Sequence, residues 1–168
     1  WEVHRRIPAP ERVAEARERI KGPVAHKDWV WAKETLLLDA LIAKKRDVEV
    51  EVQAIQVGPV VCLSNPAEYF VSYGLQLKKR SGFPMTFPVE LANGCVGYVP
   101  DEEAFGPHGG GYETRLTSYS NLEITAGTQF MNIGLELAAK MKPAKLPERP
   151  NGPAGKPWAY GDQPPQLK

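Results

Sequence analysis

The pattern of apolar and polar residues predicts two helices near the start of the chain. Residues 10–21 are rich in helix formers, with Pro10 suited to a first turn and Gly22-Pro23 ending the segment. In residues 27–45 the apolar side chains recur at intervals of three and four, and the basic residues at the end complement the helix dipole. We therefore expect a short polar helix followed by a longer amphipathic one.

The period of the pattern then changes from helical to extended. Residues 48–54 alternate between apolar and polar side chains, which is typical of a half-exposed strand. Gly58-Pro59 is a turn signal, and the continuous apolar run Val60–Leu63 is typical of a strand covered on both faces. We expect these two strands to pair as a hairpin.

A helical crossover to a further strand is predicted next. The run NPAE at residues 65–68 has the composition of a helix start, so we expect a helix from about residue 66 to Arg80. Met85–Leu91 alternate again, and Pro88 favours an edge strand or a bulge. Strand, helix and strand with one crossover imply a parallel pair. The predicted packing face of this helix consists of Phe70, Val71, Gly74, Leu75 and Leu77.

The C-terminal part divides into a helix and a tail. An amphipathic pattern over residues 125–142 predicts a last helix, whereas residues 143–168 are rich in Pro and Gly and are expected to be extended. We expect this tail to lie over a surface or a neighbouring chain, with Trp158 and Tyr160 as anchors. The predicted fold class is α/β: residues 1–142 form a mixed sheet with a parallel β-α-β unit covered by helices.

Composition narrows the function classes. The chain of 168 residues is 42% apolar and carries a net charge of +1, so it can bury one core and has no overall field that would draw nucleic acid. We expect no transmembrane segment, since no run of about 18 apolar residues occurs. Because the chain begins on Trp1, we expect it to be a piece of something longer. Cys62 and Cys95 allow at most one disulfide and do not form a zinc-binding spacing.

Two oxygen-bearing side chains follow the predicted parallel strands. Glu68 comes after the first strand and Tyr98 after the second, and loops at the carboxyl ends of parallel strands emerge on the same side of a sheet. Each has a simpler interpretation: Glu68 in a capping arrangement with Asn65, and Tyr98 as an aromatic side chain packing over the strand end. The spacing alone leaves both interpretations open.

Three sequence runs resemble a known family. AIQVGPVVCLSNPAEYF, LKKRSGFPMTFPVELANGCVGYVP and GGGYE are similar, in this order, to the C-terminal part of the zinc-hydrolase domain of neutral/alkaline ceramidases. The resemblance covers roughly residues 50–140 and implies part of a larger layered α/β zinc-hydrolase fold. Ala67 replaces a Gly of the family pattern and Cys95 a Tyr, so the chain resembles a divergent bacterial-type paralogue.

The resemblance implies a metal site shared between two portions of one protein. Glu68 in NPAEYF matches a zinc-ligating Glu, Tyr98 in GCVGYVP a zinc-ligating Tyr, and Tyr112 in GGGYE a Tyr close to the reacting centre. The family's two His ligands come from an N-terminal portion, which would therefore be the partner of this chain. The implied reaction is hydrolysis of an N-acyl amide, such as that of a sphingolipid, and the implied location is secreted or periplasmic.

Other candidate residues have weaker patterns. The three histidines, His4, His26 and His108, lack the spacing of a metal site and are expected to be surface residues, although His108 leads directly into the Gly-rich segment before Tyr112. That segment is interpreted either as a mobile loop or as a lid over a ligand. The alternative to a zinc-dependent amidase is a non-catalytic, ceramidase-like scaffold or binding protein with an incomplete metal site.

Overall fold

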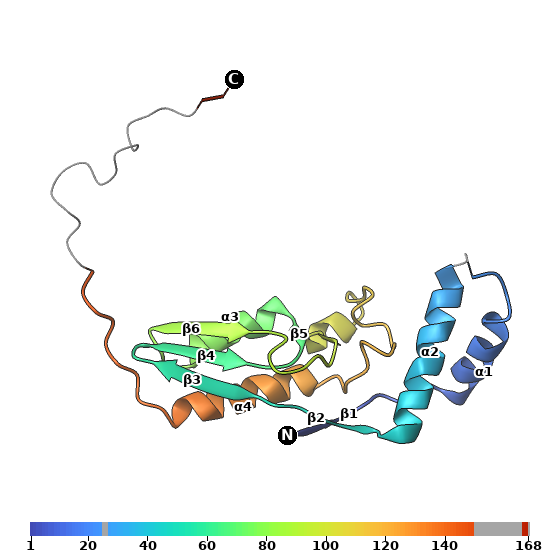
Figure 1. The fold of residues 1–168 in the computed structure, drawn as a ribbon, viewed down its shortest axis with the longest axis horizontal. Coiled ribbons are helices and arrows are strands. Elements are labelled where there is room, and N and C mark those ends of the chain that lie inside the picture. Colours follow the sequence, from blue (N-terminus) through green and yellow to red (C-terminus); the bar gives the residue numbers. More distant parts are fainter. Residues whose placement is uncertain (25–26, 150–165, 168) are drawn as a thin grey trace.

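The computed structural model describes residues 1–24, 27–149 and 166–167. In these ranges the chain forms four α-helices and three small sheets, which confirms the predicted mixed α/β class. The molecule is elongated, with a helical hairpin at one end and the largest sheet at the other (Figure 1). No helix within the described ranges has the length and apolar character needed to cross a membrane.

The helical hairpin consists of α1 (Pro10–Arg19) and α2 (Lys27–Lys44), close to the ranges that the sequence predicts. Pro10 occupies the start of α1, where its missing N–H costs no helical hydrogen bond. The two helices contact each other through small side chains, since Ala16 of α1 and Ala32 of α2 are both buried. Small residues at this contact leave room beside the helices for a surface hollow.

The largest sheet contains the predicted parallel pair. Its strands β3 (Gln53–Val57), β4 (Val60–Ser64) and β6 (Met85–Val89) lie in that order. β3 and β4 form an antiparallel hairpin, and β4 and β6 are parallel, as expected for two strands joined by a helical crossover. Pro88 lies on β6 at the edge of the sheet, where its missing N–H removes no inter-strand bond to a further strand.

The prediction of one strand over residues 48–54 is wrong. β2 (Asp47–Glu49) ends before this segment does and pairs in an antiparallel manner with β1 (Glu2–His4), while β3 begins only at Gln53. The first part of the alternating segment therefore pairs with the N-terminal residues and the second part with β4. Alternation records which side chains are buried and contains no information on the partner strand, so the break is invisible in the sequence.

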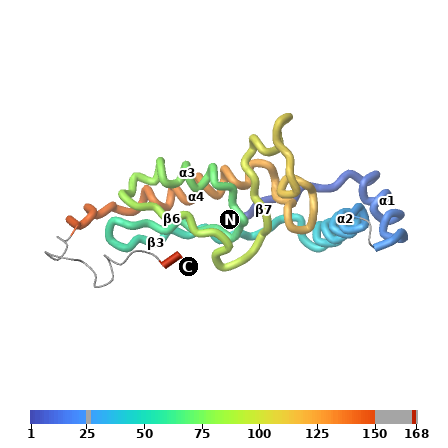
Figure 2. The backbone as a smooth tube through the Cα atoms, turned by 90° about the horizontal axis from the view of Figure 1, so that it is seen from above, coloured from blue at the N-terminus to red at the C-terminus, as the bar shows by residue number. Residues whose placement is uncertain are grey.

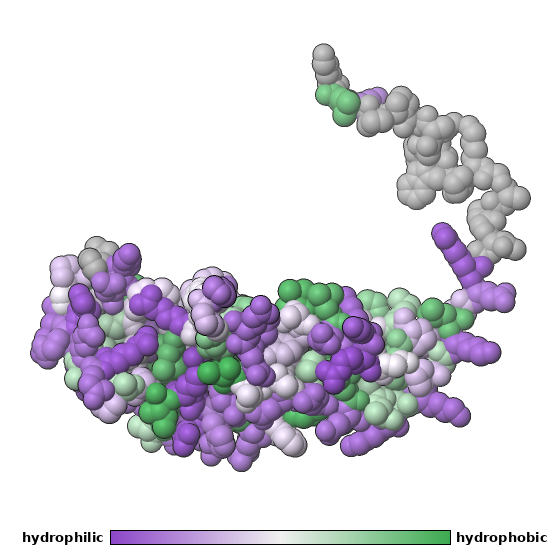
Figure 3. All heavy atoms as spheres, turned by 180° about the vertical axis from the view of Figure 1, so that it is seen from behind, coloured by the Kyte–Doolittle hydropathy of each residue, from purple (hydrophilic) through white to green (hydrophobic). Residues whose placement is uncertain are grey.

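The crossover helix begins later than predicted and packs through another face. α3 (Val71–Arg80) buries Tyr73 and Leu77, whereas Val71 is 75% exposed and Leu75 is 60% exposed. The prediction that Val71 and Leu75 lie in the packing face is therefore wrong. Apolar residues on the side of the molecule opposite to that in Figure 1 occur in small patches between hydrophilic ones (Figure 3).

The core lies between the sheet and two helices. α3 and α4 (Ala126–Ala139) run side by side along one face of the sheet (Figure 2). Phe130 of α4 is almost fully buried, and Leu63 of β4 and Leu77 of α3 belong to the same apolar cluster. Burial of these side chains supplies most of the driving force for this half of the fold.

No helix of the described residues covers the opposite face of the sheet. Strand register places Ile55 beside Cys62 and Cys62 beside Phe87 in one row, and Val57, Val60 and Met85 in the next. Val57 is 68% exposed and Phe87 is 48% exposed. An apolar sheet face of this kind usually packs against further protein.

The remaining elements are short. β5 (Glu68–Tyr69) and β7 (Tyr98–Val99) form a two-residue parallel pair, and a 3-10 helix, η1, spans Glu102–Phe105. Residues 143–149 contain no helix or strand. The predicted anchors Trp158 and Tyr160 lie outside the described residues.

Candidate functional site

The pairing of β5 with β7 places Glu68 and Tyr98 directly opposite each other. They are register partners in a parallel ladder, so their side chains leave the backbone on the same face. The Glu68 N–H donates to the carbonyl of Gly97 at 2.9 Å, and the Tyr98 N–H donates to the carbonyl of Tyr119 at 2.8 Å. The loop after β4 and the loop after β6 therefore meet, as the sequence predicts for the carboxyl ends of parallel strands.

The interpretation of Glu68 as a helix-capping residue is wrong. The Asn65 side chain does accept a bond, but from the Ala67 N–H at 3.0 Å, in a local turn that precedes β5. α3 begins at Val71, three residues after Glu68, and its N-terminus has no side-chain cap. The carboxylate of Glu68 therefore has no role at a helix start, which removes the simpler explanation for this residue.

Gly97 makes the close approach of three chain segments possible. Its φ of +80° is in the left-handed region, and a Cβ at this position would lie 1.9 Å from the carbonyl oxygen of Tyr119. Any side chain would displace the Tyr119 backbone and with it the hydrogen bond to Tyr98. A glycine is thus required immediately before Tyr98.

Tyr112 comes from the Gly-rich segment and meets Tyr98. Its hydroxyl donates to the Tyr98 hydroxyl at 3.3 Å, and the two rings are 5.2 Å apart in an edge-to-face arrangement. Gly110 and Gly111 both have positive φ angles, 130° and 91°, which turn the chain just before Tyr112. Half of Tyr112 is exposed, so its ring borders the solvent and does not fill a core.

The three side chains form one hydrogen-bonded group. Hydrogen bonding to Tyr112, and next to Glu68, raises the pKa of the Tyr98 hydroxyl above its ordinary value. The Tyr98 oxygen therefore accepts a hydrogen bond from Tyr112, and its own proton is directed to the Glu68 carboxylate. Such an arrangement keeps a potential anionic oxygen ligand neutral until a cation replaces the proton.

A small hollow of about 180 Å³ lies beside Glu68. It is lined by residues that sequence reasoning did not single out, among them Arg5, Ser118 and Tyr119. The Nη1 of Arg5 donates to the carbonyl of Lys45 at 2.8 Å, while its buried Nε has no hydrogen-bond partner in the described part of the chain. These residues are far from Glu68 in sequence, and no motif in the sequence connects them with it.

The described residues supply an incomplete set of metal ligands. Within them, no group of three or more His, Cys, Asp or Glu side chains is close enough to hold a metal ion. His4 is instead bonded to Asp47 at 2.6 Å, His108 is exposed, and His26 lies outside the described residues. Cys62 and Cys95 are both free thiols. Glu68 and Tyr98 suit zinc as two adjacent oxygen donors, and the remaining ligands would have to come from elsewhere.

Comparison with known proteins adds no relative to this picture. Neither the family models, nor the curated proteins, nor the solved structures contain a match to the chain. Any functional conclusion therefore rests on the geometry of Glu68, Tyr98 and Tyr112 and on the residues around them.

Proposed function

We propose that this chain is the C-terminal portion of a zinc-dependent amidohydrolase resembling neutral ceramidase, within a larger layered α/β zinc-hydrolase fold. The observation that supports the proposal is the hydrogen-bonded group of Glu68, Tyr98 and Tyr112. The same three residues match functional positions of the family in sequence order. Three separate chain segments bring these residues together. Similarity of short sequence motifs alone would not require the three residues to be adjacent in the fold.

Each residue has a distinct task in the proposed site. Glu68 and Tyr98 would bind zinc through oxygen atoms, at ligand distances of about 2.0–2.2 Å. A zinc ion with an open position lowers the pKa of its bound water toward about 7, which provides a nucleophile for an amide carbonyl. The exposed Tyr112 hydroxyl would donate a hydrogen bond to the carbonyl oxygen of the amide as negative charge develops on it.

The site requires two further ligands, which we assign to His residues of an N-terminal portion of the same protein. The apolar, helix-free face of the sheet offers a surface for such a portion, because Ile55, Val57 and Phe87 are exposed there. Exposed apolar side chains that form one continuous face are typical of an interface with further protein. The chain alone is therefore expected to bind zinc weakly and to show no amidase activity.

Free imidazole can replace the absent nitrogen ligands in a test. Zinc is titrated into the chain with and without imidazole, and formation of tyrosinate is followed by ultraviolet difference absorption. We expect zinc-dependent ionisation of one tyrosine that is stronger with imidazole present. Tyr98→Phe should abolish this signal, and Glu68→Gln should weaken apparent zinc binding by about tenfold or more.

Tyr119→Phe is the matched control, since its ring lies 6.3 Å from that of Tyr98 and has no ligand role in the proposal. This variant should retain the zinc response. An unchanged response in Tyr98→Phe would contradict the proposed metal site. Tight zinc binding without imidazole would contradict the shared site and direct attention to His108.

One observation favours a second function. The described residues lack a complete set of metal ligands, which is also what a non-catalytic, ceramidase-like scaffold with an incomplete site would show. In that case imidazole would not enhance the zinc response, and Glu68→Gln would leave it unchanged. The titration thus distinguishes a shared site from a decayed one.

A further inference from the structure

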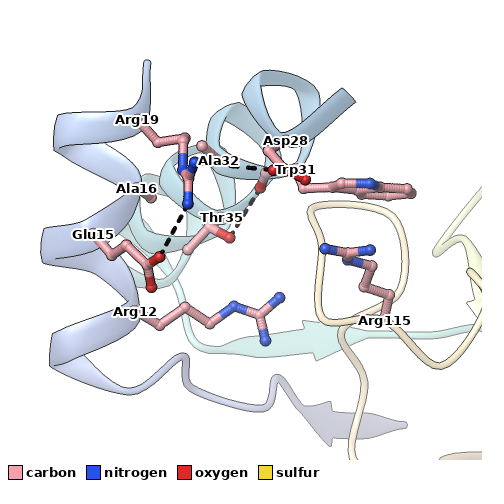
Figure 4. A pocket seen from close by; sticks show the side chains of 9 residues that line it. All are labelled: Arg12, Glu15, Ala16, Arg19, Asp28, Trp31, Ala32, Thr35 and Arg115. Atoms are coloured by element: carbon pink, nitrogen blue, oxygen red, sulfur yellow. Dashed lines mark hydrogen bonds and ion pairs between the residues drawn. The ribbon is translucent and has the colours of Figure 1, made fainter. Parts of the chain in front are cut away.

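A second hollow, remote from Glu68, lies between α1, α2 and the loop that carries Arg115 (Figure 4). Its volume is about 220 Å³. The small side chains of Ala16 and Ala32 are buried beside it, and buried Thr35 donates its hydroxyl to the carbonyl of Trp31 at 3.0 Å. The hollow is therefore a consequence of close helix packing through alanines.

Two guanidinium groups face this hollow, and neither has a carboxylate partner among the residues that the structure describes. Figure 4 shows Arg12 from α1 and Arg115 from the loop reaching toward the same space. In the described part of the chain, neither side chain forms a hydrogen bond or an ion pair with an acidic residue. Burial, and next the positive charge of Arg12, lower the pKa of the neighbouring Arg6, which places a further cation close by.

Arg115 is held in position by an aromatic ring. Its guanidinium lies over the ring of Trp31, 4.2 Å from the ring centre. Such a contact uses the flat face of the guanidinium and leaves the N–H groups at its edge free to donate. Trp31 thus orients a hydrogen-bonding edge and does not neutralise its charge.

The acidic residues of the hollow are engaged on its other side. Arg19 lies 3.5 Å from a carboxylate oxygen of Glu15 and 3.9 Å from one of Asp28. Three arginines and two carboxylates line the hollow, so its lining has a surplus of one positive charge. That surplus is concentrated at Arg12 and Arg115.

We propose that this hollow binds a phosphate group between Arg12 and Arg115. Arginine presents a planar fork of N–H donors that fits phosphate oxygens in pairs, and two such forks from separate elements would surround one tetrahedral anion. The volume of the hollow accommodates a phosphate group with a small substituent. The ligand class is a phosphate monoester or the phosphate of a lipid headgroup.

Binding at this site would also affect the loop that supplies Tyr112. The backbone N–H of Arg115 donates to the backbone carbonyl of Tyr112 at 3.2 Å, so the two residues belong to one turn. A phosphate that bridges Arg12 and Arg115 would fasten this turn to α1. The anion site is separate from the proposed metal site, and each can be disproved without the other.

The test is a titration with inorganic phosphate, with chloride adjusted to keep the ionic strength constant. The indole N–H signal of Trp31 in NMR spectra reports on the hollow. We expect a saturable shift of this signal, and a loss of affinity of about tenfold or more in Arg12→Gln and in Arg115→Gln, because each removes a charged donor. Arg115→Lys should recover only part of the affinity, since it keeps the charge and loses the fork.

Arg17→Gln is the matched control, because Arg17 also lies on α1 but points to Asp39 on α2, 3.3 Å away. It should bind phosphate as the parent chain does, and the NMR spectra of all variants show whether they remain folded. Equal affinity in parent and Arg12→Gln, or an identical shift with chloride alone, would overturn the proposal.

The two sources of phosphate are distinguished with vesicles. Binding to vesicles that contain phosphatidic acid, lost in Arg115→Gln and absent with phosphatidylcholine vesicles, would identify a lipid headgroup. Binding of inorganic phosphate without vesicle binding would identify a soluble phosphate monoester. Both outcomes support the site, whereas failure to bind either phosphate source would disprove it.

Discussion

Gly97→Ala tests whether the backbone before Tyr98 creates the site. The new Cβ would lie 1.9 Å from the carbonyl oxygen of Tyr119, while ordinary contact begins at 3.4 Å, so one segment must move by about 1.5 Å. The left-handed φ of +80° costs an alanine about 1–2 kcal/mol. The movement also disrupts two backbone hydrogen bonds, from the Tyr98 N–H to the Tyr119 carbonyl and from the Glu68 N–H to the Gly97 carbonyl. Each contributes about 1 kcal/mol to the free energy of unfolding.

The expected loss is therefore about 3–4 kcal/mol in the free energy of unfolding, measured by chemical denaturation. For a chain of this size, that corresponds to a decrease of about 6–15 °C in the melting temperature. Gly58→Ala is the matched control: its φ is +57°, and nothing lies within 4 Å of the position of a Cβ. In this variant the free energy of unfolding should fall only by the cost of the left-handed backbone conformation, about 1–2 kcal/mol.

A structural consequence should accompany the loss of stability. Displacement of Tyr98 separates its hydroxyl from that of Tyr112, so the Tyr98 hydroxyl should titrate nearer its ordinary pKa in Gly97→Ala. Gly58→Ala should leave that titration as it is in the parent chain. Equal unfolding free energies for the two variants, with the Tyr98 titration unchanged, would refute the close-approach argument.

Two further predictions concern pH and the core. Because hydrogen bonding to Tyr112 and to Glu68 raises the pKa of Tyr98, the unfolded chain loses this proton at lower pH than the folded one. The resulting stabilisation is complete below the ordinary pKa of about 10 and is lost as the pH rises through the higher folded-state pKa. The unfolding free energy measured in urea should therefore fall above about pH 10, and it should fall less steeply in Tyr98→Phe. Equal slopes of unfolding free energy against pH in the two proteins would contradict this. Phe130→Ala should lower the free energy of unfolding by about 3–5 kcal/mol, because the Phe130 side chain is only 2% exposed. Val71→Ala is the control: its side chain is 75% exposed, so the variant should change the free energy of unfolding by less than about 0.5 kcal/mol. Similar losses in the two variants would contradict the observed packing.

The elements with a long, regular pattern could be predicted from the sequence. Helix α1 follows from its helix-forming composition, and α2 and α4 follow from helical periodicity. The parallel pair of β4 and β6 follows from two apolar strands with a helix between them. Local propensity and burial pattern act within these segments, so nearby residues contain the needed information. The meeting of Glu68 with Tyr98 could also be expected, because parallel strands end at one edge of a sheet.

What the tertiary structure decided depends on contacts between residues far apart in sequence. Glu68 belongs to β5 and not to a helix, because its N–H pairs with Gly97, 29 positions later. The division of residues 48–54 between two sheets depends on the N-terminal strand β1, and the hollow at Arg12 depends on a loop that brings in Arg115. Local sequence patterns record burial and backbone preference, but these features depend on which distant segment supplies the partner, and only the folded chain determines that.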